Sequence, residues 1–151
     1  MKQKILEIED TEVFRWPWTQ LQLEEWLCDV ANMHNKSLGK LKVCIVLDQD
    51  LLKKNVEFLD HDTLTDIITF DYSSRFRLKG ELWISIDRVL ENATNLKLSL
   101  EEELLRVVVH GLLHLCGQQD KTEMESKEMR EKENEALVNW NKRAVPRGTL
   151  I

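Results

Sequence analysis

The chain has 151 residues, of which 42% are hydrophobic and 32% are charged, and a formal net charge of −6 at pH 7. This length suits one domain spanning residues 1–151, and the apolar fraction is sufficient for a packed core. No stretch approaches the roughly 18 consecutive apolar residues of a membrane span, and the first residues, MKQKILEIEDTEVF, lack the apolar region of a secretion signal. We therefore expect a cytoplasmic protein that makes no contact with a membrane.

The order of apolar and polar residues predicts both helices and strands. Runs rich in β-branched residues favour strands, and apolar residues at helical spacing favour amphipathic helices. In chain order the predicted elements are a strand at 4–8, a helix from about Thr19 to Asn35, a strand at 41–47, a short helix near 49–58, and strands at about 65–71 and 80–86. Capping boxes predict two further helices, opened by Ser99 with Glu102 and by Thr122 with Glu125. The tail after about residue 142 is expected to be flexible. Together these elements predict an α+β fold in which helices pack on a small mixed β-sheet.

The helix predicted after Ser99 leads into the segment HGLLHLCGQQD, residues 110–120. His110 and His114 are four residues apart, and side chains at that spacing lie on one helix face with Cβ atoms about 5–6 Å apart. Gly117 can adopt the left-handed conformation that ends a helix, which lets the chain turn back and bring Asp120 to the same point. Three protein ligands leave the fourth tetrahedral position of a zinc ion to water, as in catalytic zinc sites. The pattern predicts one zinc per chain on a central helix, with a zinc-bound water as the reactive group.

A histidine pair on a buried helix has a second interpretation. The surrounding segment LLRVVVHGLLHLC is apolar nearly all round, which is typical of a buried helix, and a histidine there can be a hydrogen-bonded core residue. A bare His-x3-His motif also has a real false-positive rate. The added glycine and carboxylate favour the metal site, because two buried imidazoles are costly unless their nitrogens are satisfied.

The ligand spacing is zincin-like, because zinc peptidases of the H-E-x-x-H-x-x-G-x-x-H type share the ligand and glycine positions. Those enzymes place a glutamate general base directly after the first histidine, and this chain has Gly111 there. A metallopeptidase-like hydrolase is therefore an alternative that would need a carboxylate base from elsewhere.

Three segments resemble one known family. The segment from His110 to Gly117, HGLLHLCG, resembles the H-G-x-L-H-L-x-G signature of the YbeY family of bacterial endoribonucleases and rRNA maturation factors. Asn55 to Phe70, NVEFLDHDTLTDIITF, is similar to that family's N-x-x-Y-R-x-x-D-x-P-T-D-V-L-S-F block. Gly80 to Ala93, GELWISIDRVLENA, is similar to its G-D-I-x-I-S block.

Two positions depart from the family pattern. The family's third histidine ligand falls on Asp120, which still allows a metal site, and the family's arginine beside the metal falls on Leu59. The resemblance therefore leaves the side-chain base unassigned. Asp66, His61 and Asp62 are the candidates, because they fall in the matched block.

The resemblance implies a zinc-dependent endoribonuclease that hydrolyses phosphodiester bonds in single-stranded RNA. The implied roles are maturation of the 16S rRNA 3′ end and ribosome quality control, with ribosomal RNA and the small ribosomal subunit as partners. A ribosome-assembly binding module with a structural zinc is an alternative that would explain the missing arginine and the acidic charge.

An acidic protein that binds RNA needs positive charge concentrated where the RNA lies. The segment SSRFRLK, residues 73–79, carries Arg75, Arg77 and Lys79 without an acid, and Phe76 lies between the arginines. Cations around an aromatic ring are typical of grooves that bind single strands. We predict that these four residues contact RNA, with ordinary surface charges of a hairpin as the alternative. If the two strands and the histidine helix border one cleft, this group would line it.

Overall fold

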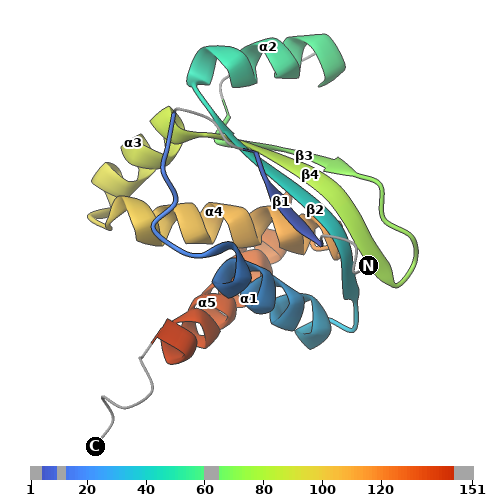
Figure 1. Ribbon diagram of the computed structural model, residues 1–151. Coiled ribbons are helices and arrows are strands. Elements are labelled where there is room, and N and C mark those ends of the chain that lie inside the picture. The colour runs from blue at the N-terminus through green and yellow to red at the C-terminus, as the bar shows by residue number, and fades with distance from the viewer. Residues whose placement is uncertain (1–4, 10–12, 60–64, 145–151) are drawn as a thin grey trace, which may run out of the picture.

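The structure is a computed structural model, and it describes residues 5–9, 13–59 and 65–144. Within these residues a four-stranded sheet in the order β1-β2-β4-β3 packs against helices (Figure 1). The strands are β1 (Leu6–Ile8), β2 (Ser37–Val46), β3 (Ile67–Asp71) and β4 (Arg77–Ser85), and the helices are α1 (Gln20–Met33), α2 (Asp48–Leu59), α3 (Ile86–Leu96), α4 (Leu100–Leu115) and α5 (Glu123–Ala144).

The sheet is mixed. β2 is parallel to both of its neighbours, β1 and β4, whereas β3 is an antiparallel edge strand paired with β4. β2 and β4 begin earlier than predicted, at Ser37 and Arg77, because these two residues pair with each other across the strands. The small mixed sheet with its packed helices confirms the predicted α+β class.

The α4 helix packs against β3 and β4 on one face of the sheet, and α1 covers β1 and β2 on the same face. The α5 helix packs against α4 and α1, on their far side from the sheet (Figure 1). Most residues of α4 are buried, as its nearly continuous apolar sequence predicts. Gly111 makes the close approach to the sheet possible, since a Cβ atom there would lie 2.7 Å from Ile67 Cδ1 and 2.7 Å from Leu82 Cδ2. On the opposite face, α2 packs Leu51 with Val46 and Ile68.

Local capping signals set several helix ends. The Ser99 side chain accepts a hydrogen bond from the Glu102 N–H at the start of α4, and Thr122 does the same for Glu125 at the start of α5. The sequence analysis did not predict α3, although Ser85 caps it by accepting from the Arg88 N–H. In the described part of the chain, no helix has the length and apolar content to cross a membrane.

Candidate metal centre

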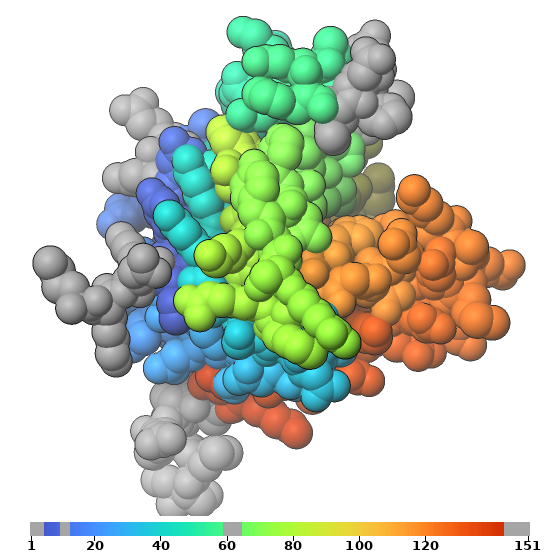
Figure 2. Space-filling model, turned by 90° about the vertical axis from the view of Figure 1, so that its right-hand side faces the viewer, coloured from blue at the N-terminus to red at the C-terminus, as the bar shows by residue number. Residues whose placement is uncertain are grey.

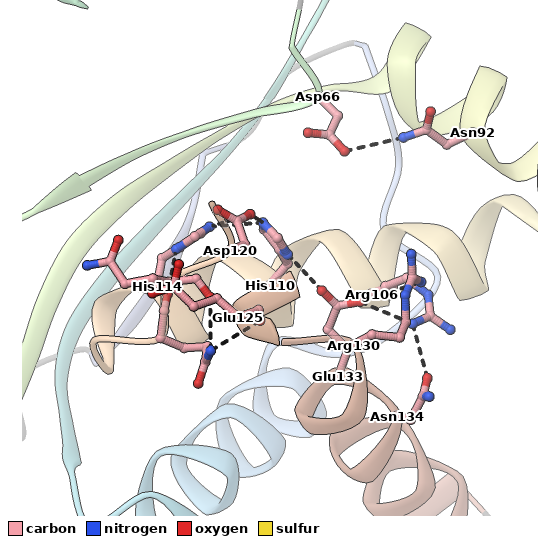
Figure 3. A network of polar contacts seen from close by, with 12 residues as sticks. Asp66, Asn92, Arg106, His110, His114, Asp120, Glu125, Arg130, Glu133 and Asn134 are labelled. Atoms are coloured by element: carbon pink, nitrogen blue, oxygen red, sulfur yellow. Dashed lines mark hydrogen bonds and ion pairs between the residues drawn. The ribbon is translucent and has the colours of Figure 1, made fainter. Parts of the chain in front are cut away.

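Two histidines reach the centre from α4, and the carboxylate comes from the loop that follows. The helix ends at Leu115, one residue after His114. Gly117 then has a φ of +100°, and its N–H bonds to the His114 carbonyl at 3.0 Å. The Gln118 N–H also turns back, to the Leu113 carbonyl at 3.0 Å. This turn directs the loop back along the helix and brings Asp120 beside both histidines (Figure 3).

The three ligand atoms form a nearly regular triangle. His110 Nε2 and His114 Nε2 are 3.0 Å apart, and each lies 3.3 Å from Asp120 Oδ2. A tetrahedral ion with bonds of about 2.0–2.1 Å separates its ligands by about 3.3–3.4 Å, so the triangle has the right size for such an ion. The side chains are 24%, 29% and 37% exposed in that order, which leaves the point between them open to solvent.

The other ring nitrogens fix the protonation of both histidines. His114 Nδ1 lies 2.9 Å from the Gln118 carbonyl, which can only accept, so this nitrogen carries the proton. His110 Nδ1 lies 2.7 Å from Glu133 Oε2, again an acceptor. In the neutral rings both Nε2 atoms therefore present lone pairs to each other and to a carboxylate oxygen. Three electron-rich atoms at 3.0–3.3 Å repel one another, and either a proton on one ring or a metal ion between the three atoms relieves that repulsion.

Glu133 is a functional residue that the sequence analysis missed. It lies on α5, and its carboxylate orients the His110 ring through the 2.7 Å contact. Burial by itself raises the pKa of Glu133, but hydrogen bonds and charges from His110 and Arg106 hold that pKa below its ordinary value. The sequence contains a sign of this role, because Glu133 lies on the same face of α5 as the apolar residues Met129 and Trp140. A carboxylate on a buried helix face indicates a paired group inside the protein.

The same contact changes the titration of His110. Burial by itself lowers the pKa of the imidazole, whereas Glu133, Asp120 and Asp66 raise it, and the net result is a raised pKa. Three carboxylates therefore give the site a negative charge, which favours a bound cation.

A cavity of about 370 Å³ opens beside the cluster. Its walls come from the residue before β3, from α3, α4 and α5, and from the loop between α4 and α5. They include Asp66, Asn92, Glu103, Arg106, His110, Asp120, Arg130 and Glu133. Asp66 is the candidate base that the structure brings to the site (Figure 3). Burial raises the pKa of its carboxyl, while the His110 charge and the Asn92 hydrogen bond oppose that rise. The other two candidates, His61 and Asp62, lie outside the described residues.

The predicted RNA-binding group lies elsewhere. Leu78, Gly80 and Leu82 of β4 face the helices, since a Cβ at Gly80 would lie 3.0 Å from Leu115 of α4. Arg77 and Lys79 alternate with these residues and so project from the opposite face of the sheet. Lys79 shares a surface hollow there with two lysines and two glutamates, Lys40, Lys42, Glu7 and Glu81. Arg75 and Phe76 lie in the turn before β4.

None of these four residues belongs to the described lining of the metal cavity. The expectation that they line one cleft with the histidine helix is therefore not met within the described part of the chain, because strand alternation separates the two surfaces. Figure 2 shows both the β3–β4 hairpin, in lime green, and the orange segments of α4 and α5 on one side of the molecule.

The position of the peptidase base is closed by packing. Gly111 is buried against the sheet, and a side chain there would point at Ile67 and Leu82, two core residues, rather than toward a ligand. A glutamate general base cannot be accommodated at this position in the observed packing.

Fold and site together define an α+β protein whose central helix carries two histidines of a three-residue cluster able to hold a metal ion. The family described as Endoribonuclease YbeY matches residues 7–141 of the chain. The chain belongs to this family, and the resemblance seen in three sequence segments is confirmed.

Similar proteins agree with this assignment. The Endoribonuclease YbeY of Porphyromonas gingivalis is 46% identical over 114 residues, which cover 76% of each chain. That of Amoebophilus asiaticus is 41% identical over 128 residues, 84% of this chain and 86% of the relative. A solution structure of a Thermotoga maritima protein has a similar fold, with a TM-score of 0.58 and 24% identity over 92% of this chain and 93% of that one.

Proposed function

We propose that the protein is a single-domain, zinc-dependent endoribonuclease of the cytoplasm that cleaves single-stranded RNA. Its proposed roles are 16S rRNA 3′-end maturation and ribosome quality control, with the small ribosomal subunit as partner. Membership of the Endoribonuclease YbeY family supports the RNA substrate. The observation that carries the proposal is the triangle of two bare imidazole nitrogens and one carboxylate oxygen at the mouth of a cavity.

We assign one zinc per chain to His110, His114 and Asp120. The donor set fits, because two neutral imidazoles and a carboxylate are ordinary zinc ligands and leave a fourth position free. A zinc ion bound there supplies Lewis-acid chemistry, acidifying water and polarising a phosphoryl oxygen.

The chain's own residues have separate tasks. Glu133 and the Gln118 carbonyl hold the imidazole rings in the tautomer that leaves Nε2 free. Asp66 is our assignment for the proton acceptor, because a carboxyl with a raised pKa that faces the cavity is suited to general-base work near neutral pH. His61 and Asp62 stay predictions of the sequence. Arg75, Phe76, Arg77 and Lys79 are proposed to bind RNA away from the cleaved bond.

The proposal is tested by measuring zinc content and RNA cleavage in the wild-type protein and in two histidine variants. Purified protein should contain one zinc per chain and cleave a single-stranded RNA but not the corresponding duplex. His114→Ala should lose both the metal and the cleavage, since it removes one of three ligands. His34→Ala is the matched control, because it removes a histidine at the end of α1, outside the cluster.

Two results would contradict this function. Zinc content unchanged in His114→Ala would remove the metal site. Zinc-loaded wild-type protein that binds small ribosomal subunits but cleaves no RNA would instead favour the ribosome-assembly module with a structural metal.

A further inference from the structure

Two arginines line the metal cavity, and they differ in how strongly the protein holds them. Arg106 is 17% exposed; its Nη1 donates to Glu133 at 3.1 Å and to Asn134 at 3.2 Å, and its Nε lies 3.6 Å from Glu103. Arg130 is 55% exposed, and its Nη1 lies 3.6 Å from Glu133 Oε1. Arg106 is therefore occupied by the protein itself, whereas the Arg130 side chain lines the cavity and is more than half exposed.

The 3.6 Å contact with Glu133 gives Arg130 little stabilising role in the fold. An exposed ion pair of this length adds little to stability. A guanidinium group presents planar, paired N–H donors that match a phosphate, and it remains charged at all working pH values. Four carboxyl groups line the same cavity, Asp66, Glu103, Asp120 and Glu133, so an incoming phosphate needs a local cation to oppose their charge.

The position of Glu133 decides which phosphate Arg130 can reach. Glu133 Oε2 contacts His110 Nδ1 at 2.7 Å, while its other oxygen, Oε1, faces Arg130. The carboxylate thus separates Arg130 from the ligand ring, and Figure 3 shows both arginines beside Glu133. The guanidinium lies beside the metal cluster rather than against it.

We propose that Arg130 binds a phosphate flanking the cleaved one, which makes it a substrate-positioning contact. The inference rests on the proposed endoribonuclease function and adds a binding subsite to it. It assigns to α5 a cation in the cavity beside the cluster, in a chain that has Leu59 at the family's arginine position.

The test compares Arg130→Ala with Lys127→Ala, which removes the same charge from an exposed site on α5 outside the cavity lining. Arg130→Ala should raise KM for single-stranded RNA about tenfold or more, the size of one charge-assisted hydrogen bond, with kcat little changed. In metal-free protein, the slope of log affinity against log salt should decrease by about 0.7, the value for one phosphate contact on a single strand. Arg130→Lys should restore part of the affinity, because the charge returns without the planar fork.

A scan of RNAs with one uncharged methylphosphonate identifies the phosphate. Neutralising the flanking phosphate should weaken binding to wild type but have no further effect on Arg130→Ala. If wild type cleaves RNA and Arg130→Ala behaves like Lys127→Ala in KM and salt slope, the subsite is wrong and the endoribonuclease proposal stands. A loss of kcat at unchanged KM also overturns the subsite. If metal-loaded wild type cleaves no RNA, the proposed function fails and the inference fails with it.

Discussion

At the scale of single residues, the geometry of the candidate metal centre depends on groups outside its three-residue cluster. The Arg106 guanidinium and the Glu133 carboxylate form a chain that ends at His110 Nδ1, and a backbone carbonyl performs the same orienting task for His114. These contacts fix which nitrogen of each ring is protonated before any ligand arrives. The cluster is therefore organised for a cation in the folded protein.

Glu133→Gln should weaken zinc binding about 10–100-fold, the usual cost of removing an outer partner of a metal ligand. The amide keeps the size of the side chain but removes the negative charge that favours the oriented His110 ring. Zinc affinity is measured by competition with a chelator. Glu131→Gln is the control, since it makes the same change at an exposed position of α5. Equal affinities in the two variants would contradict the orienting role.

Asp66→Asn should separate stability from activity. Burial raises the folded-state pKa of Asp66, so the group contributes stability below the unfolded pKa of about 3.9 and loses it as pH rises through the raised pKa. Relative to wild type, the metal-free variant should therefore gain unfolding free energy between about pH 3 and pH 7. Its RNA cleavage should fall about 10²-fold or more, because the proton acceptor is gone.

Urea unfolding at both pH values measures the first effect, and cleavage of one RNA measures the second. Asp50→Asn is the control, since it changes an exposed carboxylate of α2. It should neither raise the unfolding free energy nor lower RNA cleavage. A variant that is less stable than wild type at pH 7, or fully active, would remove Asp66 from its assigned role.

At the scale of elements, the contact between α4 and the sheet decides what chemistry the helix can carry. Glycine in a helix lowers stability by about 1 kcal/mol relative to alanine. At position 111 the missing side chain lets α4 pack closely against Ile67 and Leu82. The two histidines on either side of this contact are placed by the same packing. The helix position that carries the base in zinc peptidases is thus used for packing here.

Gly111→Glu should destabilise the protein by about 3 kcal/mol or more, because it forces a charged side chain into a filled apolar contact. Thermal unfolding measures the loss, and Gly111→Ala should cost less because it adds one carbon without a charge. Casein cleavage by Gly111→Glu should stay absent. A stable, proteolytic Gly111→Glu protein would contradict the packing argument and favour a peptidase mechanism.

At the scale of the whole molecule, several cations gather at one end of the β2–β4 pair although the chain carries −6 overall. Lys79 on β4 pairs across the strands with Lys40, and Lys36 donates to the Arg75 carbonyl at 2.7 Å. Glu7 and Glu81 share the surface hollow of Lys79, Lys40 and Lys42, so the excess of positive charge lies toward Lys36, Arg75 and Arg77. Phe76 is 61% exposed, with Arg75 Cζ 5.1 Å and Lys36 Nζ 5.8 Å from its ring centroid, so a base that stacks on the ring would also meet these cations. An RNA bound to this surface and to the metal cavity must pass around the β3–β4 hairpin.

Arg75→Ala with Arg77→Ala should lower RNA affinity and reduce the salt slope by about 1.4, since each phosphate that the protein neutralises on a single strand adds about 0.7 to the slope. Binding is measured on one single-stranded RNA across a salt series. The matched control is Lys53→Ala with Lys127→Ala, which removes two exposed cations of α2 and α5. If both double variants give the wild-type slope, the RNA follows a different surface.

The sequence by itself determined the three-residue cluster able to hold a metal ion, because the cluster depends on local geometry. Four residues on a helix place His110 and His114 together, and one glycine turn returns Asp120, so no distant contact is required. Tertiary structure decided the rest. Glu133 reaches His110 across 23 residues through helix packing, Asp66 reaches the cavity through the edge strand β3, and strand alternation turned Arg77 and Lys79 away from the metal. A sequence pattern shows which face of an element a residue occupies, but the packing of elements determines what that face meets.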